Sequence, residues 1–236
     1  MYKNTQYYNK ESVVYSQKRY PVTNTQYTHS FFNKRLEHII YLLKKIVENK
    51  TNLSLLEIGC ADGIIIGRIH DTFQKNFSLF VGIDISPEMI RVAQGRFNND
   101  IIFYTRDNFT VRELKDIIIE VGVINYAILK EEIVFSRKLL RDTGYYICSY
   151  AGSDSLFNKL KKNKDEFNNF VSYQEFENVL KNNFNLVRVI PVGFFIPYIW
   201  KVPCVARFIQ PVIEKILKPF VPNLFHEKIY LLKKKL

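Results

Sequence analysis

The chain is poor in cysteine, has no long apolar segment and carries fewer acidic than basic residues. Its three cysteines, Cys60, Cys148 and Cys204, form neither a CxxC pair nor a zinc-binding spacing. The longest uncharged apolar run, residues 189–200, is shorter than the roughly 20 residues that a membrane span needs. The N-terminus lacks the apolar core of a signal peptide. These absences predict a protein of the reducing cytoplasm.

The net charge limits the classes of possible binding partner but does not identify one. Lys and Arg number 34 against 23 Asp and Glu, a net charge of +11. Such an excess is compatible with nucleic acid, an anionic membrane surface or an anionic small substrate, or with a composition that is simply rich in lysine. The charges are spread along the chain, and the one tight run is residues 233–235. A block of basic residues of the kind that binds nucleic acid is therefore missing.

Short apolar runs and amphipathic segments alternate between residues 53 and 151. The runs at residues 52–59, 77–86, 100–105, 115–124 and 144–151 are bounded by turn formers and are typical of buried strands. The segments at residues 62–73, 86–97 and 129–142 have helical character. This alternation predicts an α/β, Rossmann-like doubly wound sheet.

The flanking regions complete the expected architecture. Residues 31–49 have helical apolar spacing, and Ser172 with Glu175 forms a capping box ahead of another helix. Strand patterns at 184–193 and 228–235 predict seven strands in all, the last one antiparallel. We expect three parts: an N-terminal helical cover at 1–50, a core at 51–193 and 227–236, and an apolar insertion at 194–226, broken into two helices at Pro211 and Pro219.

The stretch "LLEIGCADG" joins the first predicted strand to its helix. Gly59 and Gly63 allow a sharp turn where backbone N–H groups and the helix dipole favour an anionic or polar ligand. A dinucleotide fingerprint requires glycine where Ala61 stands. Glu57, just before the turn, would repel a pyrophosphate and instead suits a ligand with an ammonium group. A nicotinamide oxidoreductase is thereby disfavoured.

Two more carboxylates follow strands of the predicted sheet. Asp84 ends the second strand, where a carboxylate can accept hydrogen bonds from ribose hydroxyls. Asp107 follows the third strand, where it can accept a bond from an adenine amine. Together "LLEIGCADG", "VGIDISPEMI", "RDNF" and "DIIIEVGVINYA" resemble class I S-adenosylmethionine-dependent methyltransferases, the small-molecule branch, over residues 53–151. Ala61 is the main departure, because relatives usually carry glycine there.

The resemblance implies S-adenosylmethionine as cofactor and S-adenosylhomocysteine as product. It places Glu57 beneath the methionine amino group, Asp84 at the ribose, Asp107 at the adenine amine and Gly122 beside the transferring methyl. The cofactor-binding residues that it implies are Glu57, Gly59, Cys60, Ala61, Gly63, Asp84, Ile85, Met89, Arg106, Asp107, Asn108 and Gly122.

A general base is expected near the end of the fourth strand or on the N-terminal cover. Glu120, Tyr126 and His29 are the candidate catalytic residues. Each also has a structural interpretation: a buried carboxylate, an aromatic wall and a solvent-facing histidine. The histidines are scattered and no paired carboxylates suit a metal, so no metal site is expected.

The predicted activity is methyl transfer to an anionic small molecule, such as a sugar, nucleotide-linked or phosphorylated intermediate of surface glycan biosynthesis, by O-methylation. A quinone or lipid acceptor is the alternative that the apolar insertion favours. A binding protein without catalysis is the alternative from another class. Nucleic acid is not expected, since no proline-containing amino-methylation motif follows the fourth strand. The resemblance implies that the insertion at 194–226 caps the acceptor, and contact of this insertion with a membrane is the alternative. A monomer or homodimer is expected.

Overall fold

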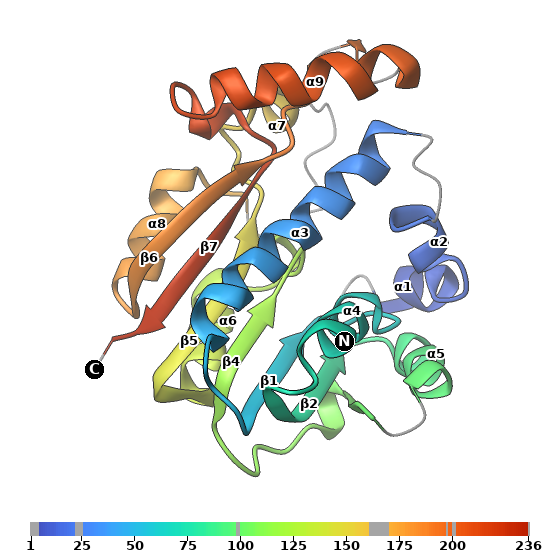
Figure 1. The fold of residues 1–236 in the computed structure, drawn as a ribbon, viewed down its shortest axis with the longest axis vertical. Helices are drawn as coiled ribbons and strands as arrows, with labels where there is room; N and C mark the ends of the chain where they lie inside the picture. The colour runs from blue at the N-terminus through green and yellow to red at the C-terminus, as the bar shows by residue number, and fades with distance from the viewer. Residues whose placement is uncertain are drawn as a thin grey trace.

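A seven-stranded mixed sheet forms the centre of the molecule, in the order β3-β2-β1-β4-β5-β7-β6 (Figure 1). Strands β1 to β5 pair in parallel, and β7 is antiparallel to both of its neighbours. This arrangement confirms the predicted doubly wound fold with an antiparallel last strand. The strands are β1 Leu53–Ile58, β2 Phe77–Asp84, β3 Ile102–Thr105, β4 Lys115–Glu120, β5 Leu140–Tyr150, β6 Phe184–Val192 and β7 Glu227–Lys234.

Helices cover both faces of the sheet, in a computed structural model that describes residues 5–21, 26–97, 100–160, 170–196, 198–199 and 202–235. Helices α3, α4 and α5 pack on one face, and α6 and α8 pack on the other, each face with its own apolar core. The α-helices are α1 Thr5–Glu11, α2 Tyr15–Arg19, α3 Tyr27–Val47, α4 Ile64–Phe73, α5 Pro87–Phe97, α6 Leu129–Leu139, α7 Leu156–Leu160, α8 Tyr173–Lys181 and α9 Pro203–Leu217.

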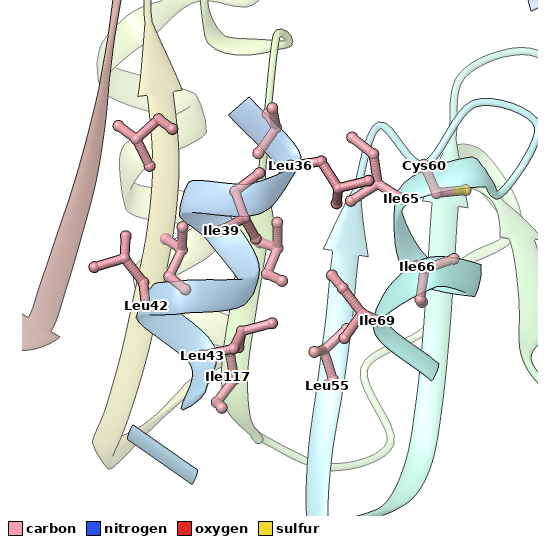
Figure 2. Packing of buried hydrophobic residues seen from close by; sticks show 14 of the residues in the cluster. Leu36, Ile39, Leu42, Leu43, Leu55, Cys60, Ile65, Ile66, Ile69 and Ile117 are labelled. Carbon is pink, nitrogen blue, oxygen red and sulfur yellow. The ribbon is translucent and has the colours of Figure 1, made fainter. Parts of the chain in front are cut away.

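Helix α3 lies across the sheet because its apolar residues recur at helical spacing. Leu36, Ile39 and Leu43 point toward the sheet and toward α4, where Ile65 and Ile69 meet them (Figure 2). All five side chains are at most 8% exposed. The expected helix over 31–49 is therefore present and begins one turn earlier, at Tyr27.

Caps at the helix starts agree with the sequence. The backbone N–H of Met89 donates to Oγ of Ser86 at 3.2 Å, so Ser86 caps the start of α5. The capping box of Ser172 and Glu175 opens α8 as predicted. Such caps fix where each helix starts, and with it the loop that precedes the helix.

Helices α1 and α2 lie inside the expected N-terminal cover, although both are short and their stretch has no clear apolar period. One other helical region differs from the sequence-based expectation. The expected break at Pro211 is wrong: α9 continues through it and ends at Leu217, before Pro219. Proline removes a single N–H donor from the helix, and buried Gln210 and Glu214 hold this stretch on the molecule.

No helix in the described ranges is both long and apolar enough to cross a membrane.

Candidate functional site

The turn after β1 is held in a left-handed backbone conformation. Gly59, Ala61 and Gly63 have φ of 73°, 48° and 79°. A side chain at Gly59 would meet Cγ2 of Val123 at 2.1 Å, so both its φ and its surroundings require glycine. Gly63 is the N-cap of α4. The turn therefore presents bare backbone at the carboxyl end of the sheet, the position where ligands bind in such folds.

Asp84 connects this turn to the end of β2 by hydrogen bonds. Its Oδ2 accepts a hydrogen bond of 2.9 Å from the Ala61 N–H, and its Oδ1 accepts one of 2.9 Å from the Ser86 N–H. Burial raises the pKa of the Asp84 carboxyl, and the backbone donors oppose this rise. The carboxylate is thus oriented before any ligand arrives.

Glu57 lies beneath the turn. Its Oε2 accepts a 3.0 Å hydrogen bond from the Ile66 N–H, which is one of the otherwise unpaired donors in the first turn of α4. Burial raises the pKa of Glu57 to about 8, with the Ile66 N–H acting in the opposite direction. Glu57 therefore joins β1 to the start of α4.

The main cavity opens above this turn. It brings together eight of the residues that the sequence singled out. Tyr8 and Tyr15 of the N-terminal helices also line it, and no motif in the sequence pointed to them. The lining residues are Tyr8, Tyr15, Ile58, Gly59, Ala61, Ile83, Asp84, Ile85, Met89, Arg106, Val121, Gly122, Val123 and Tyr126.

The remaining cofactor candidates stand outside the lining of the main cavity. Glu57, Cys60 and Gly63 lie behind the turn, and Cys60 is 2% exposed. Asp107 and Asn108 are exposed, on the 3-10 turn η1 Arg106–Asn108. Their neighbour Arg106 does line the cavity, and its guanidinium is held by both carboxylate oxygens of Glu132 at 2.7 and 2.8 Å.

Helices α1 and α2, named here the lid helices, close over the main cavity. The Ser16 N–H donates to Oδ2 of Asp62 at 3.2 Å, and the Ser16 hydroxyl donates to the same oxygen. Arg96 donates to that oxygen as well, at 3.2 Å. On α1, Oδ1 of Asn9 accepts a 2.5 Å bond from Oγ of Ser86. The lid is thus bonded to the turn itself and to the loop after Asp84.

A side cavity adjoins the main one and shares five lining residues with it: Tyr8, Tyr15, Val121, Gly122 and Tyr126. Its lining mixes aromatic and charged side chains, with Arg19 over the ring of Tyr15 and Arg35 over the ring of Phe32. The residues that line it are Tyr8, Tyr15, Arg19, Phe31, Phe32, Arg35, Val121, Gly122, Asn125, Tyr126, Ala151, His226 and Glu227.

Arg35 is the central charge of the side cavity. Its Nη1 lies 3.2 Å from Oε2 of Glu227, and its Nη2 donates to the hydroxyl of Tyr20 at 3.1 Å. Its Nε is buried and has no hydrogen-bond partner among the described residues. Glu227 also accepts a bond from Ser149, whose Oγ in turn accepts one from the Gly122 N–H at 2.9 Å. A chain of polar contacts therefore links Arg35 to the end of β4.

The structure brings one of the three candidate bases to the cavities. Tyr126 lines both of them. Glu120 is fully buried away from them, and its Oε2 accepts bonds from Ser136 at 3.0 Å and Tyr146 at 2.5 Å. Burial and the nearby Glu132 charge raise its pKa well above the usual range. His29 lies near the start of α3 and is absent from the lining of both cavities.

His226 lines the side cavity and was missed by the sequence analysis. Its ring makes edge contacts with Phe31, Phe157 and Phe195, at 4.9–5.4 Å between ring centroids. It ends the 194–226 segment, and none of the described side chains of α9 lines either cavity. Within the described ranges, no group of three or more His, Cys, Asp or Glu side chains could hold a metal ion.

A protein-family model matches the central part of the chain. The family described as "Methyltransferase domain" matches residues 49–189, which contain the turn, Asp84 and the end of β4. No curated protein matches the chain significantly.

Solved structures share the fold across nearly the whole chain. Magnesium protoporphyrin IX methyltransferase (ChlM) from Synechocystis PCC 6803, with bound SAH, has a TM-score of 0.66 at 16% identity and covers 97% of each chain. The N-methyltransferase NodS from Bradyrhizobium japonicum WM9, in complex with S-adenosyl-L-homocysteine, has a TM-score of 0.64 at 14% identity, covering 100% of this chain and 98% of NodS. At sequence identities this low, the similarity establishes a shared fold only.

Proposed function

The chain belongs to the methyltransferase-domain family, and from this premise we propose that it takes a methyl group from S-adenosylmethionine in the main cavity and transfers it to an anionic small molecule in the side cavity. The observation that carries the proposal is the pair of adjoining cavities. They meet at Gly122 and Tyr126, beyond the end of β4. One cavity has the turn and carboxylate of a nucleoside site, and the other contains two arginines.

The residues around the main cavity fit the cofactor. Gly59 and Gly122 leave the cavity wall without side chains, both at positive φ. Asp84 offers carboxylate oxygens to ribose hydroxyls, while Ile85 and Met89 supply apolar surface for adenine. Two solved structures of the same fold hold SAH or SAM. The proposed adenine contacts of Asp107 and Asn108 rest on their position after β3 alone.

When bound, the cofactor supplies an electrophilic methyl group on a positively charged sulfur. The protein's own task is to position the acceptor in line with that methyl and to exclude water. Tyr8, Tyr15 and Tyr126 line both cavities. Burial raises the pKa of Tyr8 and Tyr15, so both phenols remain neutral donors. His226, in the side cavity, can accept the proton that an acceptor hydroxyl releases.

An anionic acceptor is supported by the charges of the side cavity. Glu227 neutralises Arg35, but the buried Nε of Arg35 has no hydrogen-bond partner among the described residues. Arg19 shares Glu11 with Lys18, which lies closer to that carboxylate, at 2.6 Å against 3.9 Å. One positive charge is therefore left over at the acceptor position. A phosphorylated or nucleotide-linked sugar, methylated on oxygen for surface glycan synthesis, is the proposed acceptor class.

A lipid or quinone is the second acceptor class. The exposed apolar face of α9 favours it, because an apolar acceptor would reach the enzyme from a membrane. The proposed compartment is the cytoplasm, which the three unpaired cysteines support.

The experiment has two stages, binding and transfer. Calorimetry should show binding of S-adenosylhomocysteine and no response to NAD, and the reverse result would reject the cofactor assignment. Methyl-labelled cofactor should then label phosphorylated sugars or sugar nucleotides in preference to matched neutral sugars and quinols. Arg19→Gln should raise KM for the anionic acceptor about tenfold, whereas Arg91→Gln, an exposed arginine on α5, should not. If only quinols are labelled, the sugar proposal is rejected and a quinone-type acceptor takes its place.

A further inference from the structure

Helix α9 has its polar side toward the protein. It lies along one end of the molecule (Figure 1). The buried positions on α9 are Ala206, Gln210 and Glu214, at helical spacing. Gln210 donates to the Phe194 carbonyl at 2.8 Å, and Glu214 accepts from the Phe194 N–H at 3.0 Å and from the hydroxyl of Tyr27. Directed hydrogen bonds thus fix which side of the helix faces outward.

The outward side of α9 is apolar. Phe208 is 73% exposed, and Val212 and Ile216 are each 58% exposed. A surface helix normally buries such a stripe and exposes its polar residues, so the orientation is reversed. A continuous apolar surface of this kind marks a contact with another apolar phase. The exposed large apolar residues on and next to α9 are Val202, Val205, Phe208, Ile209, Val212, Ile216 and Phe220.

Positive charges border this apolar stripe. Lys215 and Lys218 line a groove beside the end of α9, and Lys218 also borders a second groove with His38 and Arg188. Burial, and then the charges of Lys218, Lys34 and Arg188, lower the pKa of His38 to about 4. Two further cations of the insertion, Lys201 and the side chain of Arg207, lie outside the described part of the chain.

We propose that α9 docks the enzyme on an anionic lipid bilayer, lying in the interface with its apolar stripe among the acyl chains and its lysines at the headgroups. At 15 residues the helix is shorter than a membrane span, so it lies in the plane of the surface. A bilayer with anionic lipids supplies both an apolar layer and negative charge. A second copy supplies no opposite charge, because each chain carries +11. The docking is independent of which acceptor is methylated.

Vesicle flotation of the full chain tests the docking. The protein should float with phosphatidylglycerol–phosphatidylcholine vesicles and much less with pure phosphatidylcholine. The double variant F208Q/V212Q should bind about tenfold or more weakly, because it removes two large apolar groups from the interface. The matched control V111Q/I128Q, at positions 52% and 62% exposed elsewhere on the surface, should bind as the unchanged chain does. All four positions are exposed, so folding is preserved, and circular dichroism verifies it.

Charge variants test the lysine part of the proposal. K215Q/K218Q should reduce binding about fivefold per lysine, whereas K44Q/K45Q, two exposed lysines at the end of α3, should have little effect. Absence of binding to every vesicle would overturn the proposal, as would equal binding by F208Q/V212Q. Light scattering tests for a dimer. If a dimer forms with increasing concentration and F208Q/V212Q abolishes it, a second copy of the chain covers the apolar stripe of α9 instead of a bilayer.

Discussion

The Ala61 N–H donates a 2.9 Å hydrogen bond to Oδ2 of Asp84, so the one non-glycine residue with positive φ in the β1 turn is fixed by the carboxylate that ends β2. Two neighbouring strands thereby share one polar contact at the floor of the main cavity. The contact holds Ala61 in its left-handed conformation. The hydrogen bond offsets part of the strain of a left-handed alanine.

Ala61→Gly should stabilise the free protein. Glycine adopts φ near 48° without the steric cost that alanine has, although it loses more chain entropy on folding. The free energy of unfolding should rise by up to about 1 kcal/mol, measured by urea denaturation. Ala93→Gly, in the interior of α5 at a fully buried position, should lower it. A loss of stability in Ala61→Gly would show that packing of the alanine methyl stabilises the protein by more than its backbone strain destabilises it.

Asp84→Asn should weaken cofactor binding. Both carboxylate oxygens accept backbone N–H bonds, and an amide would place its NH₂ group against one of these donors. We expect S-adenosylhomocysteine to bind about tenfold or more weakly in calorimetry. Asp100→Asn, an exposed acid in the same half of the sheet, serves as the control. Unchanged affinity in Asp84→Asn would remove Asp84 from the cofactor site.

Glu57 should make the stability of the ligand-free protein depend on pH. Its pKa rises from 4.5 to about 8 on folding, because it is buried. Between these values the folded state holds a proton that the unfolded state lacks, so stability falls as pH rises and the cost is complete above pH 8. Glu57→Gln mimics the protonated form. The free energy of unfolding of Glu57→Gln, minus that of the unchanged chain, should therefore increase by about 3 kcal/mol from pH 5.5 to 8.5. A difference that stays constant across this range would contradict the burial argument.

Ser16→Ala should loosen the lid. It removes the hydroxyl donor to Asp62, a charge-assisted bond, and leaves the weaker backbone contact. Stopped-flow measurements should show S-adenosylhomocysteine associating and dissociating faster, by about tenfold in the dissociation rate. Ser78→Ala, exposed on β2, should leave both rates unchanged. Equal rates in Ser16→Ala would mean that opening of the lid does not limit exchange.

Arg35 and Glu227 should depend on each other for stability. Both side chains are at most 7% exposed, and the ion pair measures 3.2 Å. Arg35→Met or Glu227→Gln alone leaves one buried charge unpaired and should cost about 3 kcal/mol. The double variant should cost clearly less than the sum of the two. Additive losses in the double-mutant cycle would show that the pair is not coupled.

The sheet could be read from the sequence because its strands are short apolar runs that alternate with helices. The turn and Asp84 could also be located, since glycines and carboxylates at strand ends are local signals. The lid helices could not, because α1 and α2 have little apolar periodicity and are placed by polar contacts such as Ser16 with Asp62, 46 residues away.

The side cavity was beyond sequence reasoning for the same reason. Arg35 and Glu227 are 192 residues apart, and only the antiparallel return of β7 brings them together. His226 precedes β7 and has no motif around it. Glu120 follows an apolar run in the sequence as Asp84 does, yet its side chain turns to Ser136 and Tyr146 on the far face of the sheet. Strand ends alone do not say which face a carboxylate occupies.

The bonds from the lid helices to Asp62 and Ser86 have a kinetic consequence. Because Tyr8 and Tyr15 line both cavities, the same two helices cover the proposed donor and acceptor sites. In the proposed reaction each turnover must release spent cofactor and admit a fresh one through this gate. The lid bonds therefore break and re-form once per cycle, and the turnover number of the enzyme cannot exceed the frequency at which these helices open.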